Sequence, residues 1–185
     1  MIGIRAATPD DAAAIAAIYA PYVVSTGVAL DATPPSAETM RGRIETSGDS
    51  HPWLVAIETE SGGVLAYAHA TPFRARAAYR WVVETSIYIA GDVGGRGVGR
   101  LLYGALIATL KEQGFTQAIA GIGMPNDRMI TLHESVGFRR AGVYREVGHV
   151  RGQWVDVGFW QCVLAEPDDP PEEPKSCRDV GVVRR

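Results

Sequence analysis

Glycine is concentrated between residues 91 and 99 of this 185-residue chain, directly before a segment with helical periodicity. The glycines are Gly91, Gly94, Gly95, Gly97 and Gly99. Without side chains, the backbone amides of such a loop can approach a ligand closely. Because the loop enters a helix, unpaired amides and the positive end of the helix dipole would face a bound phosphate, with Arg96 or Arg100 adding charge. The pattern predicts an anion-binding loop; the alternative is a merely flexible connection.

The spacing argues against two common phosphate sites. A Walker loop needs Gly-Lys followed by Ser or Thr, whereas Gly99 is followed by Arg100 and Leu101. A dinucleotide fingerprint belongs to an N-terminal βαβ unit with an acid about 20 residues further on. Here the glycines follow predicted antiparallel strands, and Glu112 falls within a predicted helix. We therefore expect neither an ATPase nor a Rossmann domain.

Two side chains have the chemistry of proton transfer. Glu84 lies within a predicted strand among apolar neighbours, where partial loss of solvent would raise its pKa and suit it as a general base. The alternative is a structural ion pair with a nearby arginine. His133, on a predicted helix, has an ordinary pKa of about 6.5 and could donate or relay a proton, and its alternative is plain packing. His51, His69 and His149 show no spacing typical of a metal site.

The segment before the Glu84 strand is rich in cationic and aromatic residues. Arg74 and Arg76 could pair with the oxygens of an anionic ligand, beside Phe73 and the hydroxyl of Tyr79. A charged, solvated face is the alternative for Arg74 and for Arg80. An acidic groove, which a cationic acceptor would need, is not predicted here.

Hydrophobic periodicity and turn residues predict the elements that position these groups. The predicted strands are 2–6, 53–57, 64–70, 79–89, 118–122 and a hairpin over 141–163 that turns near Arg151. The predicted helices begin at Thr8 and near Ser36, and two more cover 101–110, continuing until Gly114 ends the helix, and 127–136; residues 25–35 are predicted to be a loop. This order predicts a mixed α/β fold: a central, mostly antiparallel mixed sheet with helices on both faces.

Composition limits the other possibilities. The formal net charge is −3, with 46% hydrophobic and 21% charged residues, so we expect one globular domain over residues 1–164 and no nucleic-acid partner. Residues 165–185 hold four prolines and six acids and are predicted to be a flexible tail. No apolar run could span a membrane and no signal peptide is evident, which predicts a cytoplasmic protein. Cys162 and Cys177 are expected to be reduced thiols, without a metal cluster.

The motifs around the glycine loop resemble a known family. Residues 94–99 are similar to the acyl-CoA pyrophosphate loop of the GNAT acetyltransferase superfamily, with Gly94 standing where Gln or Arg is usual. Six further segments resemble the phosphinothricin N-acetyltransferases: 81–89, 102–106, 114–115, 123–127, 132–138 and 156–161. The likeness extends over about residues 5–164 and implies the GNAT fold, with acetyl-CoA as cosubstrate and no metal.

The resemblance also implies roles for individual residues. Glu84 would be the catalytic glutamate, and His133 occupies a position where many GNAT enzymes have a tyrosine that protonates the coenzyme thiolate. The pantetheine arm would contact Asn126 and the backbone of Ile87, Tyr88 and Ile89. The pyrophosphate would be held by the amides of Gly94, Gly95, Arg96, Gly97, Val98, Gly99 and Arg100. The loop 25–30 would border the acceptor, with Leu30 in place of a phenylalanine common in the family.

The implied reaction is acetyl transfer from acetyl-CoA to the α-amine of a small amino-acid-like molecule, by direct attack in a ternary complex. Phosphinothricin, methionine sulfone and methionine sulfoximine are the acceptors that the family suggests. An acetyltransferase of protein N-termini or polyamines is one alternative, against which Arg74 and Arg76 argue. A catalytically silent acyl-CoA sensor is another, made less favourable by the joint presence of Glu84 and His133. The resemblance further suggests a homodimer through the sheet and C-terminal hairpin.

Overall fold

A seven-stranded sheet forms the centre of the computed structural model, which describes residues 1–26, 29, 31–93 and 95–184. Its strand order is β1-β2-β3-β4-β5-β7-β6, and only the β4–β5 pair is parallel. The strands are β1 Ile2–Ala6, β2 Trp53–Glu58, β3 Val64–Pro72, β4 Val82–Ile89, β5 Gln117–Gly123, β6 Arg139–Val150 and β7 Gln153–Val163. The predicted mixed, mostly antiparallel sheet is confirmed. Leu30 and Gly94 lie outside the described residues.

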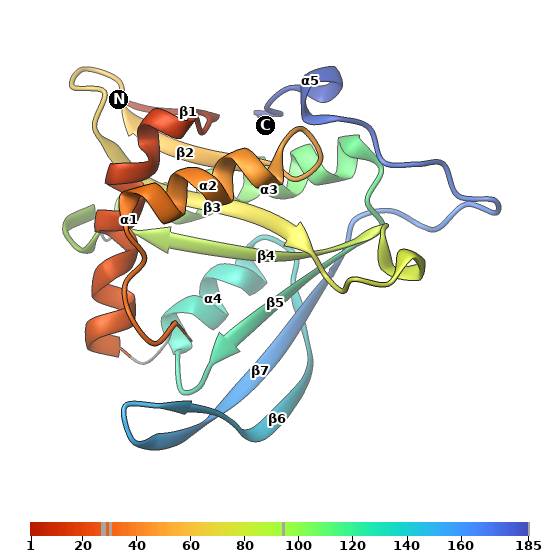
Figure 1. Cartoon of the computed structure of the whole chain (residues 1–185). Coiled ribbons are helices and arrows are strands. Elements are labelled where there is room, and N and C mark those ends of the chain that lie inside the picture. The colour runs from red at the N-terminus through yellow and green to blue at the C-terminus, as the bar shows by residue number, and fades with distance from the viewer. Residues whose placement is uncertain (27–28, 30, 94, 185) are drawn as a thin grey trace.

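Helices cover both faces of this sheet, as predicted (Figure 1). The helices are α1 Ala12–Pro21, α2 Ala37–Ser47, α3 Val98–Gln113, α4 Asp127–Ser135 and the short α5 Cys177–Val180. One buried apolar cluster contains Leu102, Leu106 and Leu110 of α3 together with the inner strands, and a second contains Ile15, Ile18 and Met40 of α1 and α2. Apolar residues on both faces of the central strands therefore require a helical layer on each side.

Local sequence signals begin α2 and end α3 where expected, whereas the helix predicted to begin at Thr8 opens as a 3₁₀ turn over Pro9–Asp11 before α1 starts at Ala12. Ser36 caps α2 by accepting a hydrogen bond from the Thr39 amide at 3.1 Å, and Gly114 ends α3 with a positive φ of 94°. The α1 helix ends at Pro21 and continues as a π-helical turn over Tyr22–Thr26, so helical structure extends into the predicted loop 25–35.

The predicted strand over 79–89 begins too early. The structure places a 3₁₀ turn at Ala77–Tyr79, and β4 starts only at Val82. Aromatic and β-branched density favoured a strand, but the amides of Tyr79 and Arg80 donate to the carbonyls of Arg76 and Ala77 within the turn, at 3.0 and 3.2 Å. A turn in place of a strand separates the arginine-rich segment from the sheet and leaves it exposed.

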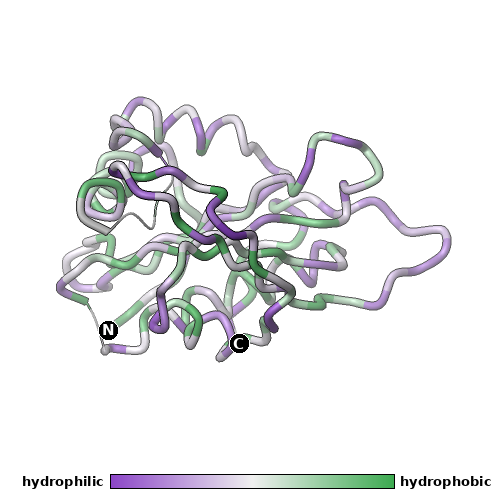
Figure 2. Tube along the Cα trace, turned by 90° about the horizontal axis from the view of Figure 1, so that it is seen from below, coloured by the Kyte–Doolittle hydropathy of each residue, from purple (hydrophilic) through white to green (hydrophobic). Residues whose placement is uncertain are grey.

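The C-terminal segment extends away from the sheet and then returns to the body (Figure 1). Figure 2 shows that its protruding part is largely hydrophilic, in contrast to the mixed colouring of the strands. The segment carries α5, and Val182 packs against the larger apolar cluster.

Candidate active site

The two parallel strands at the middle of the sheet separate after three residue pairs. β4 and β5 are in register from Val82↔Gln117 to Glu84↔Ile119, whereas β4 stays paired with β3 as far as Ile89. Figure 1 shows the two strands diverging toward their carboxyl ends. Beyond Glu84, β4 therefore presents a main-chain edge toward a gap in the sheet.

The hydroxyl of Tyr22 shows which way this edge faces. It accepts from the Ile89 amide at 3.1 Å and donates to the Ile89 carbonyl at 2.7 Å. Since alternate residues of a strand point their amide and carbonyl groups to the same side, the backbone groups of Ile87 also face away from β3, into the gap. A peptide-like ligand could pair there, as predicted for Ile87, whereas the Ile89 groups are bonded to Tyr22.

A hollow of about 40 Å³ marks the opening of this gap. It is lined by Thr85, Ser86, Ile87, Tyr88, Gly121, Ile122, Asn126, Met129 and His133. The structure thus brings together four predicted site residues from two elements, Ile87 and Tyr88 of β4 with Asn126 and His133 of α4 and its N-cap. Sequence reasoning missed Gly121, Ile122 and Met129, because only the tertiary arrangement places β5 and the first turn of α4 beside β4.

Glu84 lies at the point where the strands part. Its side chain is 39% exposed, and a Cβ built on Gly121 would be 3.8 Å from its Oε1 atom, so the absence of a side chain at Gly121 leaves room beside the carboxylate. Burial raises the pKa of Glu84, and the nearby positive charge of Arg74 opposes that shift. Arg74 Nη1 is 3.9 Å from Glu84 Oε2. The carboxylate is thus half-buried and only loosely paired, which suits a proton acceptor.

His133 is enclosed, with 3% of its surface exposed. Its ring packs edge-on against Tyr103 and Phe138, with centroids 4.8 and 5.3 Å away, and burial lowers its pKa. Nδ1 is 2.7 Å from the carbonyl oxygen of Met129. Because a carbonyl can only accept, the proton of the neutral ring resides on Nδ1 and Nε2 is left as an acceptor. Donation of a proton from Nε2 would require the imidazolium, which burial disfavours.

The glycine loop enters α3 with its amides uncovered. Gly97 is the N-cap with φ 73°, and no side chain caps the helix. The first helical bond runs from the Leu101 amide to the Gly97 carbonyl, at 3.1 Å, so the amides of Val98, Gly99 and Arg100 have no partner within the helix. This is the arrangement that the sequence predicts for a phosphate site.

Gly99 also brings this helix end close to the open edge of β4. A Cβ on Gly99 would be 2.7 Å from Ile89 Cδ1 and 3.1 Å from Leu132 Cδ2. Glycine therefore permits a close approach between α3, β4 and α4. As a result, the uncovered amides and the gap between β4 and β5 belong to one continuous region.

A groove of about 570 Å³ extends from the loop along α3. It is lined by Gly97, Arg100, Leu101, Gly104, Ile107, Ala108, Lys111, Ser135 and Val136. Of the two arginines considered for the anion, Arg100 lines this groove, whereas Arg96 pairs with Glu58 at 3.7 Å. Lys111 was missed, although its place three turns after Arg100 on one helix face was a usable signal.

The arginine-rich segment lies on the other side of Glu84. Arg74 stacks over the Phe73 ring at 4.1 Å, and the Phe73 and Tyr79 rings meet edge to face at 5.8 Å. Arg76 is the N-cap residue of the turn Ala77–Tyr79. The structure thus places Arg74 beside the candidate base and puts Arg76 and Tyr79 on one short exposed turn.

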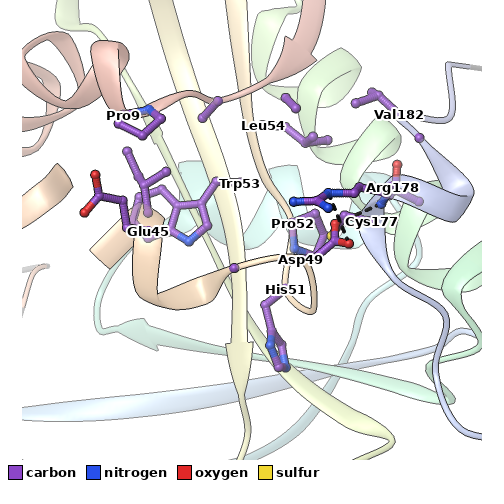
Figure 3. Close-up of a pocket in the computed structure, with 16 residues that line it drawn as sticks. Pro9, Glu45, Asp49, His51, Pro52, Trp53, Leu54, Cys177, Arg178 and Val182 are labelled. Atoms are coloured by element: carbon purple, nitrogen blue, oxygen red, sulfur yellow. Dashed lines mark hydrogen bonds and ion pairs between the residues drawn. The ribbon is translucent and has the colours of Figure 1, made fainter. Parts of the chain in front are cut away.

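A second hollow, of about 510 Å³, lies between the α2–β2 loop and the C-terminal segment (Figure 3). His51, Trp53, Cys177 and the ion-paired Asp49 and Arg178 are among its lining residues, but none of the predicted site residues is. Burial raises the pKa of Cys177 to about 11, so this thiol stays protonated near neutral pH. The hollow therefore lacks an activated nucleophile.

In the described part of the chain, every helix is too short or too polar to span a membrane. Within the same part of the chain, no group of three or more His, Cys, Asp or Glu residues is placed to hold a metal ion.

Comparison with known proteins agrees with this geometry. The model of the acetyltransferase (GNAT) domain matches residues 4–158. The chain is 38% identical to a phosphinothricin N-acetyltransferase of Streptomyces viridochromogenes, over 91% of each chain. It is 34% identical to an L-methionine sulfoximine/L-methionine sulfone acetyltransferase of Pseudomonas aeruginosa, over 87% of this chain and 94% of the relative.

A solved structure shares both fold and sequence. The phosphinothricin acetyltransferase of Sinorhizobium meliloti, determined in complex with AcCoA, superposes with a TM-score of 0.86 and 35% identity, covering 94% of this chain and 93% of that one. The separated strands, the uncovered helix start and the half-buried glutamate are thus found in a chain that is similar to acetyltransferases along nearly its whole length. This protein belongs to the GNAT acetyltransferase family.

Proposed function

We propose that this protein transfers the acetyl group of acetyl-CoA to the α-amine of a small amino-acid-like acceptor of the phosphinothricin or methionine sulfoximine and sulfone type. The observation that carries the proposal is the half-buried Glu84 carboxylate at the point where β4 and β5 separate, on the strand that leads into the glycine loop. The named acceptors of the relatives support the choice of substrate class.

The coenzyme would occupy the groups on the α3 and α4 side of the site. The pantetheine arm, itself peptide-like, would enter the gap and pair with the backbone of Ile87 near Asn126. To pair with Ile89 as well, it would have to displace the Tyr22 hydroxyl from the Ile89 backbone. The pyrophosphate would lie on the amides of residues 97–100, with Arg100 and Lys111 lining the groove beyond. A cytoplasmic location, as predicted from the sequence, is part of the same proposal.

The chemistry proceeds by direct attack in a ternary complex. A primary amine with a pKa of ~8 to 10 is mostly protonated near neutral pH, so Glu84 first takes a proton, directly or through water. The neutral nitrogen attacks the thioester carbonyl, forming a C–N bond and a tetrahedral oxyanion that a main-chain amide stabilises. The C–S bond then breaks. The sulfur leaves as thiolate and receives, directly or through water, the second proton that the nitrogen loses, so that the products are the amide and free CoA.

His133 would support this step as a neutral group. Its Nε2 atom can accept a hydrogen bond from a water or ligand donor in the gap, while its Nδ1 atom stays bonded to Met129. Such a role differs from direct protonation of the thiolate, since it needs no charged imidazole in an enclosed site. Substitution by glutamine would then retain more activity than substitution by alanine.

The acceptor would bind on the opposite side, near the arginine-rich segment. Arg76 and Tyr79 on the exposed turn would hold the carboxylate or phosphinate oxygens, and Arg74 beside Glu84 would add positive charge. Positive charge at this place opposes binding of a polyamine. Leu30, predicted to border the acceptor, lies outside the described residues.

Release of the CoA thiol tests the proposal. The assay would compare methionine sulfone, methionine sulfoximine, phosphinothricin, a peptide with a free N-terminus and spermidine. We expect turnover with the first three and at least tenfold less with the last two. If every acceptor is inert while calorimetry still shows acetyl-CoA binding, the protein is a sensor and the proposal is wrong.

We also propose a homodimer. Tyr144, Val147 and Trp154 on the hairpin of β6 and β7 are 62%, 55% and 63% exposed, and β6 is the terminal strand of the sheet. Exposed apolar side chains on an edge hairpin support burial by a second copy. Light scattering after gel filtration should give twice the mass of 19.8 kDa, and Trp154→Glu should give a monomer.

A further inference from the structure

The C-terminal segment makes contacts that its composition did not suggest. The GNAT domain match ends at residue 158, and residues 165–185 were predicted to be a flexible tail. In the structure the described part of this segment is held to the body at two places, one at α3 and one immediately before β4.

The first place is a buried anchor at the end of α3. The fully buried side chain of Gln113 donates through Nε2 to the carbonyls of Lys175 and Ser50, at 2.9 and 3.1 Å. The main-chain carbonyl of Gln113 accepts from the Lys175 amide at 2.7 Å. Nearby, the Asp49 carbonyl accepts from the Cys177 amide at 2.6 Å, and the Asp49 side chain pairs with Arg178 (Figure 3). These bonds set where the segment crosses the body.

The second place lies next to the acceptor side of the candidate active site. The indole N–H of Trp81 donates to the Glu172 carbonyl at 2.8 Å. The guanidinium of Arg80 donates from Nε to both carboxylate oxygens of Glu173, at 2.8 and 3.1 Å, and its Nη2 is 2.8 Å from Oε1. Arg80 also stacks over the Trp81 ring at 3.9 Å. The Arg80 guanidinium is therefore fixed by two contacts: the carboxylate of Glu173 accepts its hydrogen bonds, and the indole of Trp81 stacks against it.

The same guanidinium reaches into the turn that carries the acceptor residues. Arg80 Nη1 donates to the Ala77 carbonyl at 3.1 Å, and the Arg80 amide donates to it at 3.2 Å. Ala77 begins the turn that ends at Tyr79 and is capped by Arg76. A continuous set of contacts thus runs from Glu173 through Arg80 to the turn with Arg76 and Tyr79.

We propose that the segment 172–178 is a strap that positions the acceptor-binding turn, so that residues outside the GNAT domain match set the affinity for the acceptor. This inference rests on the proposed function for the identity of the acceptor. Glu173 and Trp81 are positioning residues, because they act through Arg80 and the turn. Without Glu173, the Arg80 side chain gains conformational freedom, and the turn Ala77–Tyr79 loses one contact that restrains its backbone conformation.

Two variants and a matched control test the strap. Glu173→Gln keeps the shape of the side chain and removes its charge, while Trp81→Phe keeps a ring and removes the indole donor. Asp168→Asn, in the exposed part of the C-terminal segment before the strap, removes a charge that forms no hydrogen bond or ion pair with the described residues. For each full-length variant, KM is measured for methionine sulfone and for acetyl-CoA, and hydrogen exchange is followed for the amides of residues 77–81.

We expect Glu173→Gln to raise KM for methionine sulfone about two- to fivefold, the range for an exposed ion pair, with KM for acetyl-CoA unchanged. Trp81→Phe should act in the same direction, and exchange of the 77–81 amides should become faster in both variants and stay unchanged in Asp168→Asn. The proposal is overturned if exchange is unchanged, or if both KM values rise equally. If no acceptor is turned over even by the unmodified protein, the proposed function fails, and the exchange data alone decide whether the strap exists.

Discussion

The two sides of β4 are built from different parts of the chain. Val83 and Ile87 belong to the apolar cluster with α3, and on this side the proposed coenzyme-binding groups are main-chain amides at a strand edge and a helix start. Glu84 and Tyr88 alternate with them and point to the other face, where the proposed acceptor-binding groups are side chains such as Arg74 and Arg76.

This difference indicates how each side tolerates change. Binding by main-chain groups depends on backbone geometry. Only substitutions that disturb this geometry, such as a replacement of Gly99, should weaken binding on this side. Side-chain binding changes with a single substitution. A fold of this kind can therefore keep its coenzyme and vary its acceptor, because the two requirements lie on opposite faces of one strand.

The largest expected effect comes from removing the base on the acceptor face. Glu84→Gln should lower kcat about 10²- to 10⁴-fold while the Kd for acetyl-CoA, measured by calorimetry, stays the same. Because burial raises the pKa of Glu84, the rate of the unmodified protein should fall as the pH drops through that raised pKa. The variant should lack this acid limb.

Glu60→Gln, on the exposed β2–β3 turn, is the control for Glu84→Gln and should behave like the unmodified protein. Full turnover by Glu84→Gln under conditions where chemistry limits the rate would show that another group takes the proton.

A smaller effect, on the KM for the acceptor alone, is expected from a substitution on the acceptor face of β4. Arg76→Leu removes one charged hydrogen-bonding group and should raise KM for the acceptor about 10- to 100-fold. KM for acetyl-CoA should not change. Arg128→Leu, at an exposed position of α4, is a matched loss of charge that should alter neither KM value. Equal rises in both KM values for Arg76→Leu would contradict the separation of the two sides.

Gly99→Ala tests the main-chain side. The added Cβ must displace the end of the Ile89 side chain, so the Kd for acetyl-CoA should rise about tenfold and the free energy of unfolding should fall by about 1–2 kcal/mol. Gly42→Ala in α2 meets no atom within 4 Å and should instead stabilise the fold by about 0.5–1 kcal/mol. Unchanged coenzyme binding in Gly99→Ala would show that the helix start is not part of the site.

The smallest effect is expected for the cations beside the loop. Arg100→Gln should weaken acetyl-CoA binding about two- to fivefold at low salt and less at high salt, because an exposed charge contributes little where main-chain amides dominate. Arg96→Gln should have an even smaller effect, since Arg96 pairs with Glu58. A hundredfold loss in either variant would mean that side chains, rather than the backbone, carry coenzyme binding.

Much of this architecture was predictable because its signals are local. Hairpins, helix caps and the glycine loop depend on residues a few positions apart, and the order of strands and helices followed from them. The start of β4 was not predictable in this way. The residues before Val82 have strand-forming side chains, but bonds within the turn at Ala77–Tyr79 override that preference.

The sequence predicted which residues form the site better than it predicted their protonation states and tautomers. The sequence indicated that burial would raise the pKa of Glu84, and the structure agrees in direction. For His133 it left proton transfer and packing open. The bond from Nδ1 to Met129 and the enclosure by Tyr103 and Phe138 decide its tautomer and lower its pKa.

The sequence by itself determined the order of elements, the uncovered helix start and the acid on the central strand, because each depends on neighbours along the chain. Only the tertiary structure decided that β4 and β5 part after Glu84, that Arg74 lies beside that carboxylate, and that Glu173 reaches Arg80 from 93 positions away. Contacts over such distances depend on how whole layers pack, and no local pattern of residues encodes them.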